Sequence, residues 1–438
     1  MSTANPVATR RTRHALFVAF HFPPEASSSG VLRTLKYTRY LGAHGWRVTV
    51  LTFDRSAYDV QDPAFERQIP ADVRVVRTRF LNVKRHLAIR GVYPGFAAVP
   101  DVWIGWWPWA VRAGRRLLRT DPFDLVYSTS PHATAHLVAK SLAGRARCPW
   151  VVDFRDPWYE EPPEPGTPRV VHWAARRLER LVVHRAALVL ASTGQLQNTL
   201  AARYRTEPPS KFATIPNGYD EDDFAVVPRR DPNPRMELLV LHAGSVNPHF
   251  RDPRPVFAAA REAADAGALE LSRLRFRFLG AGPFGDTSEM REAIHAAGLD
   301  GRVEFIPRIE YSRALVELTR ADLLLLLQDS PDTESLVPAK LFEYLRAGRP
   351  VLAVGRPGAS AEILARVGGG WASDPRVNGA LRAGLSHAYR AWQEGTLDQT
   401  AADPAALKRF SRQQLAAELA SRFDSLVPPG PSRSRPAR

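Results

Sequence analysis

Short apolar runs alternate with longer amphipathic stretches along most of the chain. The runs 14–20, 48–53 and 73–78 have the length of strands, and the amphipathic stretch 31–43 lies between the first two. Strands that alternate with helices are typical of a parallel sheet, because each parallel connection needs a crossover segment. The pattern therefore predicts a doubly wound α/β fold.

The same alternation continues and then restarts once. In the first half, further strands are predicted at 125–127, 150–153, 187–191 and 211–215. The segment 226–236 is rich in proline and charge and lacks periodicity, which indicates a linker. After it, strands are predicted at 238–242, 275–279, 303–306, 322–327, 351–354 and near Gly370. Two successive halves of this kind predict two Rossmann-like domains.

The length of the chain is consistent with this division. Its 438 residues are 45% hydrophobic, which is enough for two domains that each have a core. We predict a disordered tail at 1–13, an N-terminal domain at 14–225, a linker at 226–236, a C-terminal domain at 237–403, a C-terminal helix at 404–424 and a second tail at 425–438.

Cysteine content and hydropathy limit the class of protein. Cys148 is the only cysteine, which excludes an intramolecular disulfide and a cysteine-based metal cluster. Apolar runs such as 323–327 are far shorter than the roughly 20 residues that cross a bilayer. The first residues lack the long apolar region and small-residue cleavage site of a secretory signal. We therefore expect a cytoplasmic protein.

A net charge of +15 directs attention to anionic partners. The arginines are spread over most predicted helices, and no zinc-finger spacing or RNA-binding motif is visible, so we expect no nucleic-acid partner. Two interpretations stay open. The protein works at an anionic membrane surface, as a peripheral protein on the inner face of the plasma membrane, or the arginines are ordinary solvated helix faces.

The segment 333–354, TESLVPAKLFEYLRAGRPVLAV, predicts a loop, a helix with Pro338 in its first turn, and a buried strand. Lys340 and Glu343 are three residues apart and share a face near the start of this helix. A helix N-terminus favours anions, so a diphosphate beside the ammonium and a ribose beside the carboxylate would fit. An ordinary surface pair on an amphipathic helix accounts for the same residues.

Three motifs carry a resemblance to a known family. They are PAKLFEYLRAGRPV, VVDFRDPW and the turn IPNGYD, and the similarity extends from His14 to Phe423. The chain resembles retaining glycosyltransferases of the GT-B fold, of the family four type (group 1). This resemblance implies two Rossmann-like domains facing across a cleft, of which the first takes the acceptor and the second binds a nucleotide sugar. It also implies that the last helix packs back on the first domain.

The resemblance implies a set of donor-binding residues. Glu343 would hold the ribose, and Gly244 and Arg251 would bind the diphosphate, with Arg254 as a substitute for Arg251. Arg308 would lie near the nucleobase. Lys340 would also contact the donor. The family has a further donor-binding glutamate eight residues before the position of Glu343. This chain has Ser335 there, with Glu334 beside it.

Acceptor-binding residues are implied in the first half. Gly30 and Arg33 lie in the first loop and the helix that follows it, although a salt bridge from Arg33 to Glu25 or another acid is an alternative. The VVDFRDPW motif contributes Asp153, Arg155 and Asp156. An internal Asp–Arg pair that holds the loop is the alternative for these three residues.

A histidine completes the set. His132 matches a family histidine that is aimed at the reacting sugar, and His136 follows it one helical turn later. The catalytic residues implied by the resemblance are therefore His132, Arg251 and Lys340.

The implied activity is the transfer of a hexose from a nucleoside diphosphate sugar to a hydroxyl group, with retention, in polysaccharide or glycoconjugate biosynthesis. The acceptor would be a saccharide, a lipid-linked molecule or a small molecule. No cofactor is expected, and no metal, because no D-x-D motif stands in suitable surroundings. The alternatives are a sugar-nucleotide epimerase or hydrolase of the same fold, and a non-catalytic nucleotide-binding partner subunit, which Ser335 keeps open.

Overall fold

The computed structural model describes residues 12–28, 30–90, 92–93, 95–159, 161, 163, 166–228, 236–329 and 334–427. The chain forms two compact units. Unit 1 comprises Met1–Pro216 and Arg412–Arg438, and unit 2 comprises Asn217–Ser411. The division falls before the predicted linker, of which 229–235 lie outside the described residues, as do 1–11 and 428–438 of the predicted tails.

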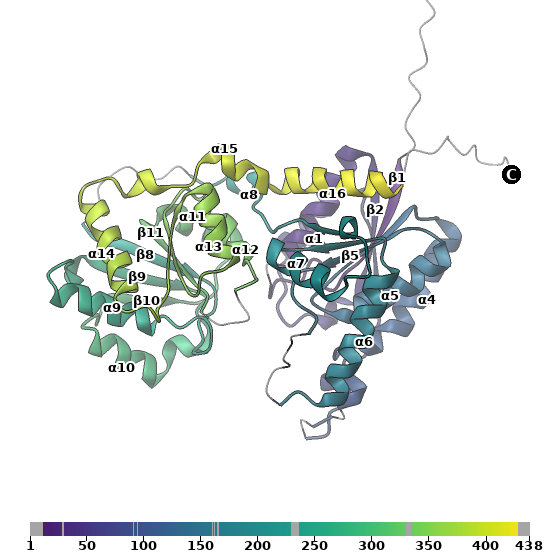
Figure 1. The fold of residues 1–438 in the computed structure, drawn as a ribbon, viewed down its shortest axis with the longest axis horizontal. Coiled ribbons are helices and arrows are strands. Elements are labelled where there is room, and N and C mark those ends of the chain that lie inside the picture. Colours follow the sequence, from purple (N-terminus) through teal and green to yellow (C-terminus); the bar gives the residue numbers. More distant parts are fainter. Residues whose placement is uncertain are drawn as a thin grey trace, which may run out of the picture. The chain divides into compact units, whose positions relative to one another are not determined.

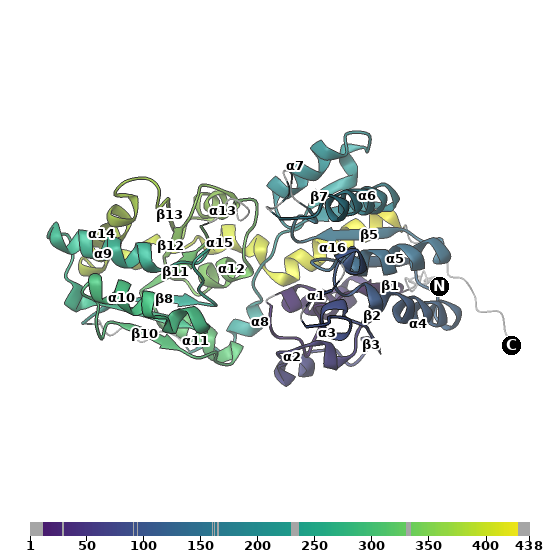
Figure 2. The same ribbon diagram turned by 90° about the horizontal axis from the view of Figure 1, so that it is seen from below.

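Unit 1 is built on a seven-stranded sheet with the order β3-β2-β1-β4-β5-β6-β7 (Figures 1 and 2). The strands are β1 (Arg13–Val18), β2 (Trp46–Phe53), β3 (Arg74–Thr78), β4 (Leu125–Thr129), β5 (Trp150–Phe154), β6 (Leu188–Ala191) and β7 (Phe212–Thr214). Every pair is parallel, and Val18 of β1 pairs with both Leu51 and Ser128. Both faces of this sheet are covered, which explains why its central strands read as continuous apolar runs.

Helices cover both faces of this sheet. One face packs against α1 (Gly30–Tyr40) and α16 (Arg412–Leu426). The other packs against α4 (Trp107–Thr120), α5 (Ala133–Ala146), α6 (Arg169–Arg185) and α7 (Gly194–Arg203). Shorter elements are η1 (Leu41–His44), η2 (Arg55–Ala57), α2 (Pro63–Arg67), α3 (Val83–His86), η3 (Gly95–Ala98), η4 (Ile104–Trp106) and η5 (Pro209–Lys211).

The C-terminal helix α16 is part of the core of unit 1 (Figure 1). Phe423 is fully buried, and its ring lies 5.2 Å from that of Trp46 and 6.4 Å from that of Phe17. Trp46 Nε1 also donates a hydrogen bond of 2.8 Å to Asp424 Oδ1. The end of the chain thus closes the face of the sheet that α1 leaves open.

Unit 2 repeats the architecture with a six-stranded parallel sheet of order β10-β9-β8-β11-β12-β13. The strands are β8 (Leu238–Ala243), β9 (Leu274–Leu279), β10 (Val303–Ile306), β11 (Leu323–Leu327), β12 (Val351–Val354) and β13 (Gly370–Ser373). Helices α9 (Arg254–Asp265), α10 (Ser288–Ala296) and α14 (Ala380–Gln393) cover one face.

The other face of the unit 2 sheet is covered by α8 (Glu221–Phe224), α11 (Tyr311–Arg320), α12 (Ala339–Arg346), α13 (Ala359–Val367) and α15 (Pro404–Leu407). The remaining elements are η6 (Leu271–Arg273), η7 (Pro283–Asp286), η9 (Leu397–Thr400) and η10 (Lys408–Phe410). In the described part of the chain no helix is both long and apolar enough to cross a membrane.

The predicted fold class is confirmed, since both sheets are parallel and Rossmann-like. Element ends differ in detail. The helix predicted over 31–43 is α1 followed by the tighter turn η1, which ends where Gly45 adopts a φ of 77°. Pro338 precedes α12 as its N-cap residue instead of lying in its first turn.

Replacing the buried ring of α16 tests its role in unit 1. We expect Phe423→Ala to lower the free energy of unfolding of this unit by about 3–5 kcal/mol, because it removes a large buried ring and leaves a cavity. Urea unfolding followed by tryptophan fluorescence reports on unit 1, which holds all ten tryptophans except Trp371 and Trp392. The partly exposed Arg422→Ala on the same helix is the control, and an equal loss there would contradict the assignment.

Candidate functional site

The predicted donor-binding residues lie at one edge of the unit 2 sheet. Gly244 follows β8, Arg308 follows β10, and Glu334 and Ser335 lie in the segment after β11. In a parallel sheet the carboxyl ends of the strands share one edge, where ligands of such folds bind. Backbone hydrogen bonds join the loops here, from Gly244 N–H to Leu279 O at 2.8 Å and from Gly280 N–H to Ile306 O at 2.8 Å.

Gly244 and Lys340 are in direct contact at this edge. Gly244 has a φ of 124°, and a β-carbon at this position would collide with Lys340 Nζ. The ammonium group donates a hydrogen bond of 2.6 Å to Ala243 O. The backbone conformation favours glycine here, and a β-carbon would also displace the Lys340 ammonium group. The result is an ammonium group held against the first loop of the unit.

The loop that follows Gly244 carries Arg251. Asn247 and Arg251 exchange two backbone hydrogen bonds of 3.2 and 3.3 Å, and the Asn247 side chain accepts from the backbone N–H groups of His249 and Phe250. This closed loop directs Arg251, whose Nη1 donates to Ser245 Oγ at 3.1 Å. Within the described residues neither Arg251 nor Lys340 forms an ion pair with a carboxylate, so two cations lie together at this edge.

Glu343 lies on α12 one turn after Lys340 and is 8% exposed. Tyr311 of α11 donates a hydrogen bond of 2.9 Å to Glu343 Oε1, which fixes the carboxylate. The next residue, Tyr344, accepts a hydrogen bond of 2.8 Å from the Ala243 N–H. Helix α12 thus binds both backbone groups of Ala243, the N–H through Tyr344 and the carbonyl through Lys340.

Burial shifts the charge state of Lys340. Desolvation of the ammonium group, reinforced by the positive charge of Arg251, lowers the pKa of Lys340 to about 7, although Glu343 acts in the opposite direction. His242, fully buried at the end of β8, has its pKa held well below the usual range, mainly by burial and then by Lys340. Positive charge at this edge is therefore costly until an anion is present.

The remaining predicted donor residues lie around this centre. The Arg308 backbone packs against the turn at Gly280, 3.8 Å from the position of a β-carbon there. Glu334 accepts a hydrogen bond from Arg356 at 3.3 Å, and its carbonyl caps α13 through Ala359 N–H at 2.8 Å. Ser335 is partly buried beside it.

Arg254 is a different case. Its guanidinium forms several hydrogen bonds with Asp252, the shortest 2.7 Å, whereas Arg251 has no carboxylate partner among the described residues. This difference favours Arg251 over Arg254 as the cation of the loop.

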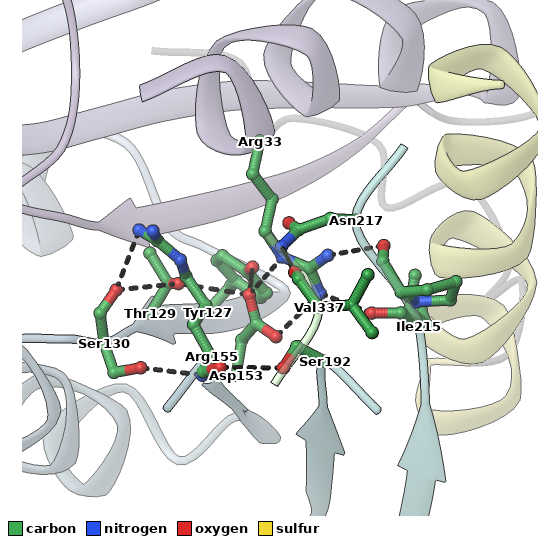
Figure 3. Close-up of polar contacts among 11 residues, drawn as sticks. Arg33, Tyr127, Thr129, Ser130, Asp153, Arg155, Ser192, Ile215, Asn217 and Val337 are labelled. Carbon is green, nitrogen blue, oxygen red and sulfur yellow. Dashed lines mark hydrogen bonds and ion pairs between the residues drawn. The ribbon is translucent and has the colours of Figure 1, made fainter. Parts of the chain in front are cut away.

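In unit 1, Arg33 and Asp153 form a buried ion pair (Figure 3). Arg33 Nε and Nη2 donate to the two Asp153 oxygens at 2.8 Å each, and both residues are 0% exposed. Arg33 also donates to the carbonyls of Ile215 and Pro216 at 2.9 and 2.7 Å. Burial acts to raise the pKa of the Asp153 carboxyl, but Arg33 outweighs it and the pKa lies below its ordinary value.

This geometry favours the internal Asp–Arg pair over acceptor contact for Arg33 and Asp153. Asp153 Oδ2 also accepts hydrogen bonds from Tyr127 Oη at 2.5 Å and from Thr129 Oγ1 at 3.1 Å, as Figure 3 shows. A pair with Glu25 does not form, since Glu25 bonds to His21 Nδ1 at 2.8 Å. The ion pair joins α1 to β5 and to the chain after β7.

Gly30 and Arg155 are close together at the start of α1. A β-carbon on Gly30 would lie 2.5 Å from Arg155 Cζ, so any side chain here would require the guanidinium to move. The Arg155 backbone is fixed by Ser130, whose Oγ accepts from its N–H at 2.7 Å, and by Ser192, whose hydroxyl donates to its carbonyl at 2.7 Å (Figure 3). Arg155 and its neighbour Asp156 are partly buried.

His132 is the N-cap residue of α5 and is partly buried. Its ring lies 4.4 Å from Phe20 and 6.0 Å from His21 in a stacked arrangement. Burial, followed by the charges of His21 and Arg155, lowers the pKa of His132 to about 3, so the imidazole is neutral near pH 7. His136 is 0% exposed and hydrogen-bonded to Ser128 at 2.8 Å, which is a core position.

Several residues of these sites are not among those predicted from the sequence. His21, paired with Glu25, stacks on His132 in unit 1. In unit 2, His242, Tyr311 and Tyr344 surround Lys340 and Glu343. The signal for His242 was present, since it is a polar residue at the end of an apolar strand. Nothing in the local pattern marks Tyr311, which contacts Glu343 only through the tertiary fold.

Metal binding receives no support from side-chain clustering. Within the described ranges, no group of three or more His, Cys, Asp or Glu side chains is placed to hold a metal ion. Metal independence stays a prediction.

Two Rossmann-like domains of this topology define the GT-B class of folds, and solved structures of that class match the chain. The Anabaena Alr3699/HepE complex with UDP-glucose is 16% identical over 94% of this chain and 100% of its own, with a TM-score of 0.65. The lipopolysaccharide outer core galactosyltransferase WaaB is 12% identical over 94% and 99%, with a TM-score of 0.60.

A third match is a structure described as a putative UDP-N-acetylglucosamine 2-epimerase from Listeria monocytogenes. It is 13% identical over 95% of this chain and 96% of its own, with a TM-score of 0.57. At sequence identities this low, the similarity to these three structures establishes the fold alone. No curated protein matches the chain in sequence.

The match to a known family lies in unit 1. Residues 30–218 match the sequence profile of the family described as "Glycosyl transferase 4-like domain". The chain is therefore similar to glycosyl transferase 4-like proteins over these residues, and the predicted resemblance is confirmed. The roles of individual site residues stay predictions.

Breaking the buried ion pair separates a structural role from a binding role. We expect Asp153→Ala to lower the free energy of unfolding by about 3–5 kcal/mol, because Arg33 would remain buried without a counter-charge. Chemical unfolding of unit 1 measures this loss. Asp156→Ala, three residues further on, should cost less than about 1 kcal/mol. Small and equal losses at both positions would contradict the structural assignment.

Proposed function

We propose that the protein is a retaining glycosyltransferase that moves a hexose from a nucleoside diphosphate sugar to a hydroxyl acceptor in polysaccharide or glycoconjugate biosynthesis. One observation carries the proposal. Lys340 and Arg251 lie beside a glycine-bearing loop at the carboxyl edge of the unit 2 sheet, without a carboxylate ion-pair partner in the described chain. Two cations in this position match the charge of a diphosphate.

Glu343 supports a nucleotide in place of a simple phosphate. Its carboxylate is oriented by Tyr311 and lies one turn along α12 from Lys340. A ribose next to the diphosphate would donate its hydroxyl groups to this acceptor. UDP-sugars are the first donors to test, because UDP-glucose is bound in the structurally similar HepE.

The chemistry follows from fixed positive charge. As the bond between the sugar C1 and the diphosphate oxygen breaks, negative charge develops on the leaving oxygen. Lys340, Arg251 and the first-turn N–H groups of α12 would stabilise it. The acceptor oxygen forms its bond to C1 on the same face, and its proton passes to the leaving diphosphate. No base from the protein is required in this scheme.

Unit 1 would supply the acceptor side. The neutral His132 imidazole and the Arg155 guanidinium lie after β4 and β5, at the carboxyl edge of the unit 1 sheet. A neutral imidazole can accept or donate a hydrogen bond to a sugar hydroxyl without a charge penalty. The acceptor itself, a saccharide, a lipid-linked molecule or a small molecule, is selected by residues of this unit.

A panel of donor sugars tests the proposal. We expect slow release of nucleoside diphosphate from one of the UDP-, GDP-, ADP- or dTDP-sugars without added acceptor, measured by a coupled nucleotide assay. Glu343→Ala and Lys340→Ala should each lower the rate at least about tenfold, because each removes a charged hydrogen-bond partner. Epimerisation of the donor without release would identify an epimerase instead.

A matched control separates the site from general damage. Arg254 already has Asp252 as its partner, so Arg254→Ala should leave donor turnover within about twofold. Binding of nucleotide without turnover of any donor, lost in Lys340→Ala, would identify a non-catalytic nucleotide-binding protein. Turnover that is insensitive to both Glu343→Ala and Lys340→Ala would contradict the site.

The pKa of Lys340 predicts that nucleotide binding takes up protons. With the pKa at about 7 in the free protein, the amine is mostly neutral at pH 8. A bound diphosphate stabilises the ammonium form and raises the pKa, so binding at pH 8 should take up about one proton. Affinity should fall as pH rises from 7 toward the raised pKa.

Calorimetry at pH 8 in buffers of different ionisation enthalpy measures this uptake. The second ionisation of a phosphate lies near pH 6, so the nucleotide itself contributes little at pH 8. Lys340→Met should bind more weakly and without proton uptake. The same uptake in this variant would assign the proton to another group.

A further inference from the structure

Six large apolar side chains are exposed in two neighbouring segments of unit 1. Their exposed fractions are 47% for Leu87, 79% for Ile89, 75% for Val92, 75% for Phe96, 61% for Val170 and 62% for Trp173. Single exposed apolar residues are ordinary on a protein surface, but a cluster of this kind marks an interaction site.

The two segments pack on each other. The 3₁₀ helix η3, which carries Phe96, contacts α6, which carries Val170 and Trp173. A β-carbon on Gly95 would lie 4.0 Å from Val171 Cγ2, at van der Waals distance. Ile89 and Val92 are joined by a backbone bridge just before η3. We call these six side chains the apolar patch.

Arginines follow Trp173 along the sequence of α6. Trp173, Arg176, Arg177 and Arg180 follow at helical spacing and are all exposed, so they share one face. They line a cavity of about 640 Å³ together with Arg203 and Arg205. Trp173 belongs to both the apolar patch and this arginine-lined cavity, which makes the two continuous.

Part of this positive charge has no counter-charge among the residues that the structure describes. Arg203 bonds to the buried Glu179 at 2.7 Å, and Arg176 lies 3.3 Å from Glu161. Arg177 lies over the Trp173 ring, with Cζ 5.9 Å from its centroid. Among the residues that the structure describes, Arg177, Arg180 and Arg205 form no ion pair with a carboxylate.

We propose that the apolar patch and the α6 arginines dock unit 1 on an anionic lipid bilayer. Phe96 and Trp173 would enter the boundary between headgroups and acyl chains, and the arginines would bind lipid phosphates. Charge complementarity selects this partner, because exposed aromatic and aliphatic side chains beside uncompensated arginines match the two layers of an anionic membrane surface. The net charge of +15 also favours binding to an anionic surface.

This surface is separate from the candidate donor and acceptor residues. None of its side chains belongs to the sets around Lys340 or Asp153, and docking needs neither donor nor acceptor. Vesicle binding therefore succeeds or fails independently of the proposed glycosyl transfer. Docking would bring unit 1 to substrates that reside in the membrane.

Cosedimentation with vesicles tests the proposal. The full-length protein should bind phosphatidylglycerol-containing vesicles but not pure phosphatidylcholine at 0.15 M salt, and binding should weaken toward 1 M salt, where charges are screened within roughly 3 Å. Phe96→Ser/Trp173→Ser should lower the partition coefficient about tenfold. Arg176→Gln/Arg177→Gln/Arg180→Gln should lower it about 100-fold, roughly fivefold for each arginine.

Matched controls lie on unit 2. Met236→Ser/Val377→Ser removes side chains that are 84% and 58% exposed, and Arg261→Gln/Arg291→Gln/Arg320→Gln removes the same net charge from exposed sites. These controls should bind vesicles as the wild type does. Circular dichroism and melting temperature should be unchanged in all variants, since every substituted side chain is exposed.

Three outcomes would overturn the proposal. They are failure of the wild type to bind anionic vesicles, equal losses in the unit 2 controls, which would indicate a general charge effect, and full binding by both unit 1 variants. Gel filtration without vesicles tests whether a second copy of the chain binds to the apolar patch. A change of oligomeric state in Phe96→Ser/Trp173→Ser would make the patch an interface between copies of this chain.

Discussion

Parallel pairing of every strand is the constraint on which the candidate sites depend. It places the carboxyl ends of the strands at one edge of each sheet, so residues far apart in sequence come together. Gly244 and Lys340 are the clearest case. They are separated by about half of the sequence of unit 2, yet the side chain of Lys340 occupies the space that a side chain at position 244 would need. A different strand order would leave each of them an ordinary loop or helix residue.

The Arg33–Asp153 pair performs the corresponding task in unit 1. A buried ion pair is stable only when its geometry is good and its remaining donors are satisfied, and both conditions hold here. By binding α1, β5 and the chain after β7, the pair fixes the segment that ends in Arg155. The residues of the motif VVDFRDPW therefore have different roles. Asp153 stabilises unit 1 through its ion pair with Arg33, and Arg155 lies at the carboxyl edge of the sheet.

Much of the fold was predictable because strands and helices leave strong periodic signals. The fold class, the two α/β halves and most strands followed from short apolar runs separated by amphipathic stretches. Helix ends were less accurate, as with α1 and η1, where Gly45 decides the boundary. The candidate site was predictable only as far as motifs reach. Tyr311 lies outside any motif, and its bond to Glu343 exists only because α11 and α12 pack together.

Roles within a motif were harder to predict than its position. The sequence offered Arg33 as either an acceptor ligand or half of an ion pair, and named Glu25 as a partner. Pattern alone cannot choose, because a pair 120 residues apart in sequence is invisible to local periodicity. The outcome depends on register, since Asp153 is the residue of β5 that pairs with Thr129 and so faces α1. Glu25 forms a hydrogen bond with His21 instead, and Arg33 pairs with the carboxylate of Asp153.

The electrostatics of unit 2 show why a site of this kind needs a rigid scaffold. Burial of the Lys340 ammonium group, reinforced by repulsion from Arg251, lowers the Lys340 pKa to about 7. A flexible loop would relieve this strain by moving one cation into solvent. Here the hydrogen bond from Lys340 to Ala243 O and the closed Asn247–Arg251 loop prevent that movement. The unfavourable charge is therefore preorganised, and the anion that we propose for this site would offset it without rearrangement of the two cations.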